Sequence, residues 1–168
     1  MRILSRLLAG GCLLSLGFSL PAVAADDGKV FQDWAVKCEK IAGTDKQGCF
    51  ALQNVIVKES DKVMLNAMVG YPGDRKDPVM LLTLPLGVHL PTGVDFQIDG
   101  NKPVHMQYEL CNPKGCLVVG AMPAELVNAM KSGTAAKIIV ADSQRKKGDI
   151  PLSLKGFTAA LGSLSPVK

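Results

Sequence analysis

The chain has 168 residues, which is long enough for one domain with a proper hydrophobic core. Its 19 basic and 15 acidic side chains give a net charge of +4, and this near balance argues against a nucleic-acid-binding protein, whose footprint is a strongly basic face. The sequence contains no repeat and no low-complexity stretch, so its composition indicates a globular domain.

The N-terminus has the three parts of an export signal. Arg2 and Arg6 supply a basic start, residues 7–20 form an apolar run, and residues 21–24 end in a small-x-small cleavage pattern. The apolar run is shorter than the roughly 20 residues that a membrane-spanning helix needs. No later segment is long and apolar enough to span a bilayer either.

We therefore expect residues 1–24 to be a cleaved signal peptide and residues 25–168, which number 144 (168 − 24), to form one exported domain. The alternative is a lipoprotein signal at Cys12, preceded by Ala9-Gly10-Gly11. That alternative would shorten the apolar part of the signal and leave an apolar run on the mature N-terminus.

Short segments of alternating hydrophobicity, separated by Gly, Pro, Asn and Asp, make up most of the mature chain. Asp99-Gly100 between two such segments is a typical hairpin turn, and the central prolines are expected in loops and edge strands. About nine short strands predict an all-β, single-domain antiparallel β-sandwich, with a barrel as the alternative. The predicted strands cover residues 34–38, 49–57, 63–69, 79–84, 94–98, 104–108, 117–120, 136–141 and 150–154.

One or two short helices are expected among the strands. Pro123 suits the first position of a helix, Glu125 favours its positive end, and Lys131 and Gly133 are typical of its end. A second short helix is expected over residues 157–161. Neither helix forms a strand–helix–strand repeat, so a parallel sheet is not expected.

Four cysteines lie beyond the predicted signal, and an even number of cysteines after a signal predicts disulfides. Cys111 and Cys116 enclose Asn, Pro and Gly, which favour a tight reversal, and Cys38 and Cys49 flank a predicted turn. We expect the local pairs Cys38–Cys49 and Cys111–Cys116, both structural, because each turn brings its two sulfurs close.

Other pairings and other roles fit these cysteines less well than local structural disulfides. The crossed pairings would close longer loops and so stabilise more on the chain-entropy model, which means that proximity, not energy, selects the local pairs. A redox-active dithiol is associated with a two-residue spacer at a helix N-terminus, and neither is visible between Cys111 and Cys116. A zinc site of four cysteines is disfavoured in an oxidising compartment.

The remaining polar residues suggest no catalytic or metal site. His89 and His105 lie on different segments without metal-ligand spacing, and no serine lies in a Gly-x-Ser-x-Gly context. Trp34 alternates with Val36 and Cys38, so we expect it to be a buried core residue. We expect no enzyme activity, no cofactor and no bound metal.

Arg145, Lys146 and Lys147 form a basic cluster between the last two predicted strands. The simplest interpretation is a solvated hairpin tip. The functional alternative is contact with an anionic glycan or with lipid headgroups, which three charges would support modestly.

The ordered motifs of the chain resemble the invasion-associated locus B family of exported bacterial proteins. The resemblance extends from about residue 31 to residue 164. It rests on Phe31-Gln32-Asp33-Trp34 with Cys38 and Cys49, on Ile98-Asp99-Gly100, on Cys111 and Gly115-Cys116, and on residues 153–161. The resemblance implies a compact β-sandwich in the bacterial envelope or outside it, and in some pathogens such proteins are linked to host-cell entry. It implies no catalytic residue and no cofactor.

Two classes of function follow from these observations. The first is a non-enzymatic envelope or secreted protein that contributes to invasion through protein or host-surface contacts, which an exposed apolar or basic patch would favour. The second is a periplasmic module that binds a small ligand or aids envelope assembly, which a concave pocket with convergent polar groups would favour. The sequence identifies neither the partner nor the oligomeric state.

Overall fold

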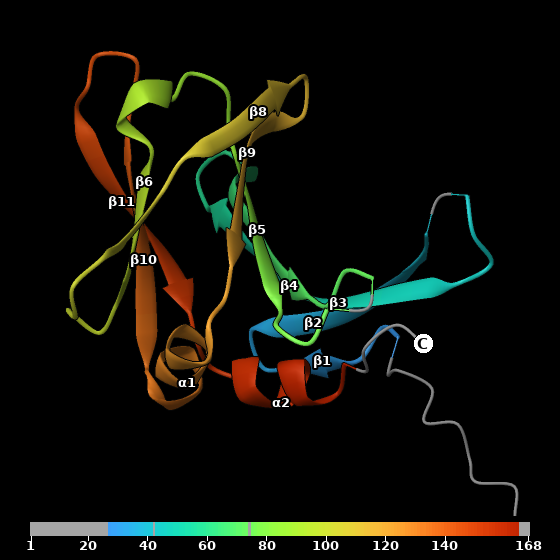
Figure 1. The fold of residues 1–168 in the computed structure, drawn as a ribbon. Helices are drawn as coiled ribbons and strands as arrows, with labels where there is room; N and C mark the ends of the chain where they lie inside the picture. The colour runs from blue at the N-terminus through green and yellow to red at the C-terminus, as the bar shows by residue number, and fades with distance from the viewer. Residues whose placement is uncertain (1–26, 42, 74, 165–168) are drawn as a thin grey trace, which may run out of the picture.

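The computed structural model describes residues 27–41, 43–73 and 75–164, so the predicted signal peptide and Cys12 lie outside the described residues. The described residues form two antiparallel sheets that enclose one core, with two short α-helices at one end (Figure 1). This arrangement confirms the predicted all-β fold.

The larger sheet has seven strands. Its strand order is β1-β2-β3-β4-β5-β9-β8, and all of its neighbouring strands pair antiparallel. In the central strands of this sheet alternate residues face the core, as Leu65, Ala67 and Val69 do in β4. The strands are β1 (Val30–Phe31), β2 (Trp34–Lys40), β3 (Gln47–Val57), β4 (Lys62–Gly70), β5 (Val79–Leu84), β8 (Tyr108–Asn112) and β9 (Gly115–Ala121).

The smaller sheet has four strands in the order β11-β10-β6-β7. They are β6 (Val94–Ile98), β7 (Val104–Met106), β10 (Ala135–Ala141) and β11 (Lys147–Ser153). As predicted, Asp99 and Gly100 form the turn between β6 and β7, and both have positive φ angles, 44° and 79°. The β10–β11 hairpin and the β8–β9 hairpin lie at the end of the sandwich opposite the α-helices (Figure 1).

One strand prediction needs correction. The segment predicted as one strand over 104–108 is divided, because the chain leaves the smaller sheet after Met106 and enters the larger one at Tyr108. Pro78 and Pro85 lie in loops, as expected, and the strand between them, β5, is central in the larger sheet. The prolines end this strand on both sides without interrupting its hydrogen bonds.

The two α-helices cover one end of the core. Helix α1 (Ala124–Ser132) buries Val127 and Met130, and helix α2 (Phe157–Gly162) buries Phe157, Ala160 and Leu161. Both were expected, although Pro123 is the N-cap of α1 and not its first helical residue. A single 3₁₀ turn, η1 (Leu90–Thr92), precedes β6. No described helix is long and apolar enough to cross a membrane.

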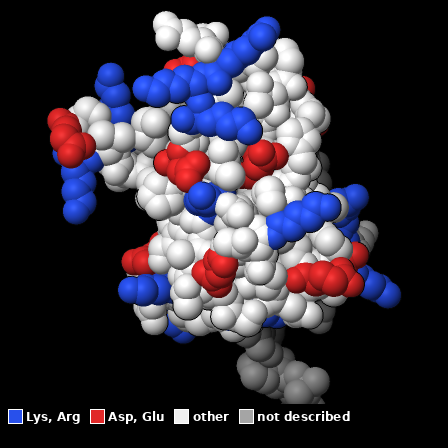
Figure 2. All heavy atoms as spheres, turned by 90° about the vertical axis from the view of Figure 1, so that its left-hand side faces the viewer, with Lys and Arg blue, Asp and Glu red and all other residues white. Residues whose placement is uncertain are grey.

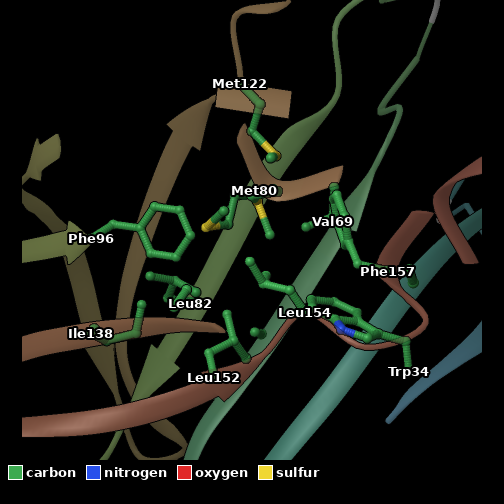
Figure 3. Packing of buried hydrophobic residues seen from close by; sticks show 14 of the residues in the cluster. Trp34, Val69, Met80, Leu82, Phe96, Met122, Ile138, Leu152, Leu154 and Phe157 are labelled. Carbon is green, nitrogen blue, oxygen red and sulfur yellow. The ribbon is translucent and has the colours of Figure 1, made fainter. Parts of the chain in front are cut away.

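Side chains from both sheets and from the α-helices meet in the core (Figure 3). Trp34 is fully buried, as predicted, and its ring meets the Phe157 ring edge-on, with 5.2 Å between the ring centroids. Met80 and Leu82 of the larger sheet face Phe96 and other residues of the smaller sheet. Aliphatic, sulfur-containing and aromatic side chains together fill the space between the sheets.

A cluster of hydrogen bonds joins the two sheets beside Trp34. Trp34 Nε1 and Gln53 Nε2 both donate to the carbonyl oxygen of Ser153, at 2.9 Å and 3.1 Å. The backbone N–H of Ser153 donates to Gln53 Oε1 at 2.9 Å, and its hydroxyl donates to Asp33 Oδ2 at 2.6 Å. Gln53 therefore acts as a strand partner for β11, and we call these four residues the inter-sheet cluster.

The predicted disulfides Cys38–Cys49 and Cys111–Cys116 are present in the structure. In each pair the cysteines lie directly opposite one another on neighbouring strands, β2 with β3 and β8 with β9. Each disulfide therefore closes a hairpin within the larger sheet and does not connect the two sheets.

Replacing both cysteines of one pair with alanine should lower the free energy of unfolding by about 3 kcal/mol for Cys38–Cys49 and about 2 kcal/mol for Cys111–Cys116. These values follow from the loop lengths in the chain-entropy model. Urea unfolding with and without reductant measures these losses. Reductant should lower the free energy of unfolding of the double variant less than that of the parent, because the variant has one disulfide fewer to lose. Free thiols in the folded parent would contradict the prediction.

Candidate functional site

The predicted basic cluster lies on the loop that joins β10 to β11. Asp142 organises this loop, because its Oδ1 atom accepts the backbone N–H groups of Gln144 and Lys146, each at 2.9 Å. The carbonyl oxygen of Asp142 also accepts the N–H of Arg145 at 2.9 Å. Arg145 has a φ angle of 64°, the left-handed conformation that closes the turn. The basic side chains thus extend from a backbone held by several hydrogen bonds.

Arg145, Lys146 and Lys147 are exposed, and none of them forms an ion pair with a described acidic group. On the same hairpin, Lys137 does pair with Asp149, at 2.8 Å. Figure 2 shows basic side chains gathered at the top of this face, the end at which Figure 1 places the β10–β11 hairpin, with acidic groups beneath them. The structure thus brings the three predicted contact residues together at one tip.

A pocket of about 370 Å³, which we call the loop pocket, opens beside this tip. One wall comes from the larger sheet and the segment after β5, and the other comes from the β10–β11 hairpin. The walls are connected, because Val88 pairs with Asp142 in a β-bridge and His89 donates its N–H to the Ala141 carbonyl at 2.8 Å. The lining residues are Met64, residues 84–88, residues 140–142 and residues 146–148 with Ile150.

A second pocket, of about 330 Å³, lies on the outer face of the larger sheet, and we call it the outer-face pocket. Its lining is mainly apolar and includes Phe50, Met68, Tyr71 and Leu81. The charged residues at its edge are already paired: Lys40 with Asp45 at 3.1 Å, and Glu39 with Lys37 at 2.6 Å.

The two histidines make hydrogen bonds to nearby polar side chains. His105 Nδ1 lies 2.7 Å from Asp95 Oδ1 and its Nε2 lies 2.8 Å from Gln107 Nε2, while His89 Nδ1 lies 2.6 Å from Thr92 Oγ1. Among the described residues no three His, Cys, Asp or Glu side chains form a group suited to a metal ion.

Asp99 and Tyr108 have altered pKa values, and both shifts have structural causes. The backbone N–H groups of Ala135 and Thr134, with the Thr134 hydroxyl, hold the pKa of Asp99 below its usual value. Burial raises the pKa of Tyr108 to about 12, and its hydroxyl has no hydrogen-bond partner among the described residues. Neither group lines the loop pocket.

The apolar residues of the loop pocket were not predicted as site residues. Met64, Leu84 and Val140 each look like ordinary strand residues in the sequence. Leu86 is the exception, since an apolar residue between Pro85 and Gly87 is expected in a turn, where its side chain is exposed. In the structure the side chain of Leu86 is 60% exposed.

Comparison with known proteins identifies a family and a similar solved structure. The model of the family described as invasion associated locus B (IalB) protein matches residues 34–165. The crystal structure of invasion associated protein B from Bartonella henselae is similar, with a TM-score of 0.69 and 22% sequence identity over 80% of this chain and 91% of that chain. At this identity the likeness concerns the fold. No curated protein sequence matches the chain.

Proposed function

Because the chain belongs to the invasion associated locus B family, we propose that it is a non-enzymatic exported protein that contributes to host-cell invasion through contacts with a protein or an anionic surface. Its place is the periplasm, the bacterial envelope or the medium outside. The predicted signal peptide and the two disulfides support export, because disulfides persist in oxidising compartments.

The observation that carries this proposal is the set of three unpaired cations on the β10–β11 loop. Lysine or arginine near an anionic membrane surface contributes about 1 kcal/mol each, provided that the charge can approach the surface. Asp142 holds the loop backbone, so the charges reach a surface together with little loss of backbone freedom. This arrangement supports contact with anionic lipid or glycan.

The triple variant Arg145→Asn, Lys146→Ser and Lys147→Ser should bind vesicles that contain anionic lipid on the order of 10- to 100-fold more weakly at low salt. Asparagine is chosen at position 145 because it tolerates the positive φ angle there. Vesicle co-sedimentation measures binding, and the melting temperature should be nearly unchanged because the replaced side chains are exposed.

A matched control removes three positive charges elsewhere: Lys102→Ser, Lys131→Ser and Lys155→Ser, all exposed residues close to the α-helices. This control should keep most of the binding. Equal loss in both variants would mean that only net charge matters, and unaltered binding in the loop variant would remove the loop from the proposal. Turnover of an envelope substrate by the purified domain would overturn the non-enzymatic part.

A periplasmic ligand-binding or envelope-assembly role, with an indirect effect on invasion, is the second candidate. The loop pocket favours it, because Lys146 and Lys147 line a cavity with mainly apolar walls. The two candidates differ in what the basic residues contact: a surface in the first and a single molecule in the second.

A further inference from the structure

We propose that the loop pocket binds an anionic amphiphile with one acyl chain, such as a fatty acid or an alkyl phosphate. The chain lies between the two walls of the pocket, and the anionic head contacts Lys146 and Lys147 at its rim. This inference deepens the proposed function by naming a ligand for the basic loop, and in that respect it rests on that function.

The walls of the pocket suit a hydrocarbon chain. Leu84 and Ile150 are buried, and Met64, Val88 and Val140 are partly buried, so apolar surface faces a cavity that opens to solvent. A chain that covers this surface removes it and its own methylenes from water, and each methylene so buried raises the affinity about fourfold. The pocket volume of about 370 Å³ lies within the range of small-molecule sites, about 300–1,000 Å³.

The charges at the rim select an anionic head. Lys146 and Lys147 both line the pocket, and neither has an acidic partner among the described residues. Asp142 also lines it, but its Oδ1 atom already accepts two backbone N–H groups. Two free cations against one such carboxylate leave a net positive rim, which attracts a carboxylate or phosphate and repels a cationic head.

The outer-face pocket lacks unpaired cations among the described residues of its rim. It is also apolar, but Lys40 and Glu39 at its edge are each paired with a neighbour of opposite charge. A neutral apolar molecule has no reason to prefer the loop pocket over the outer-face pocket, whereas an anionic amphiphile does. The difference between the two pockets therefore indicates that the basic rim selects the proposed ligand.

The loop pocket is held in shape without a ligand. The Val88–Asp142 bridge and the hydrogen bond from His89 N–H to the Ala141 carbonyl fasten its two walls to each other. The hydrogen bonds of Asp142 hold the rim. Little ordering is then needed when a ligand binds, which favours affinity.

Gly148 provides a variant that fills the pocket and leaves the charges in place. It lies opposite Val140 in the β10–β11 pairing and two residues before the buried Ile150, so a side chain there faces inward. A Cβ at Gly148 meets no heavy atom within 4 Å in the described part of the chain. Gly148→Phe should therefore occupy the cavity without a backbone clash, and Gly148→Ala, which adds one methyl group, is its control.

Isothermal titration with alkyl phosphates of increasing chain length, each below its critical micelle concentration, tests the proposal. Dodecyl phosphate should bind one to one, and affinity should rise with chain length; inorganic phosphate and dodecyltrimethylammonium should bind at least tenfold more weakly. Gly148→Phe and the pair Lys146→Ser, Lys147→Ser should each lower the affinity for dodecyl phosphate at least tenfold, while Gly148→Ala keeps most of it.

Equal affinity for the cationic and the anionic amphiphile would overturn the proposal, and so would unchanged dodecyl phosphate binding by a folded Gly148→Phe protein. Vesicle co-sedimentation separates this inference from the proposed surface contact. If Gly148→Phe loses dodecyl phosphate but still binds anionic vesicles, both stand. If the parent binds dodecyl phosphate but no vesicle, the pocket ligand stands and the surface contact fails; the reverse result overturns the pocket ligand alone.

Discussion

Trp34→Ala is expected to lower the free energy of unfolding by about 3–5 kcal/mol, the range observed when a large buried aromatic side chain is truncated. Trp34 is fully buried, so the substitution leaves a cavity between the larger sheet and α2. It also removes the edge-on contact with Phe157 and the Nε1 hydrogen bond to the Ser153 carbonyl. Three losses at one position make this a severe change for a domain of ordinary stability.

Trp34→Phe is the matched control. It keeps an aromatic ring beside Phe157 but removes the N–H donor, while Gln53 Nε2 still donates to the Ser153 carbonyl. The expected loss is therefore smaller, about 1–2 kcal/mol. Urea unfolding followed by circular dichroism measures both variants, since Trp34 is the only tryptophan and fluorescence disappears with it. A Trp34→Ala protein as stable as the parent would contradict the core role.

Gly156→Ala is expected to lower the free energy of unfolding by about 2–5 kcal/mol, from two causes that add. Gly156 has a φ angle of 86°, which costs a residue with a Cβ about 1–2 kcal/mol. A Cβ there would also overlap the carbonyl oxygen of Phe31 and lie 2.6 Å from its carbonyl carbon. The backbone must shift to relieve this contact, at a further cost of about 1–3 kcal/mol.

Two glycines separate these causes. Gly100 has a similar φ angle, 79°, but a Cβ there meets no heavy atom within 4 Å among the described residues, so Gly100→Ala should show the conformational cost alone. Gly162, in α2, is equally open, and Gly162→Ala should stabilise the protein by about 0.5–1 kcal/mol. Urea unfolding of all three variants is the measurement. Equal losses at positions 156 and 100 would show that the contact with Phe31 is unimportant.

Trp34 and Gly156 belong to two motifs that lie far apart in the sequence and meet in the structure. The first motif, residues 31–34, contributes the Phe31 carbonyl, Asp33 and Trp34, and the last, residues 153–161, contributes Ser153, Gly156 and Phe157. The alternation of Trp34 with Val36 predicted that the ring would be buried. It did not identify its partners, because they lie more than 100 residues away and depend on how the two sheets pack.

Gln53 is a second residue whose partner could not be predicted from the sequence. In the sequence it is a polar residue within a strand, with nothing to mark it as buried. The structure buries it to 7% exposure and pairs its amide with the backbone of Ser153, so the polar group is satisfied. The partner lies in the other sheet, so the residues next to Gln53 in the sequence do not predict that contact.

Features that depend on local chemistry could be predicted from the amino-acid sequence. Alternating hydrophobicity predicted the strands, Asp99-Gly100 predicted its hairpin, and the turn residues between the cysteines predicted both disulfides, because each of these is decided within a few residues. The basic loop belongs to the same group. Its three charges are adjacent in the chain and lie together wherever the loop is placed.

The surroundings of that loop depend on how the two sheets pack, which the sequence pattern does not specify. The loop pocket is built from Met64 of β4, Leu84 of β5, the segment that follows, and both strands of the β10–β11 hairpin. Strand order and register bring these residues together, and both are properties of long-range pairing that a side-chain pattern of period two leaves open. The same physics divides the predicted strand at residue 107, where the chain must cross from one sheet to the other to close the core.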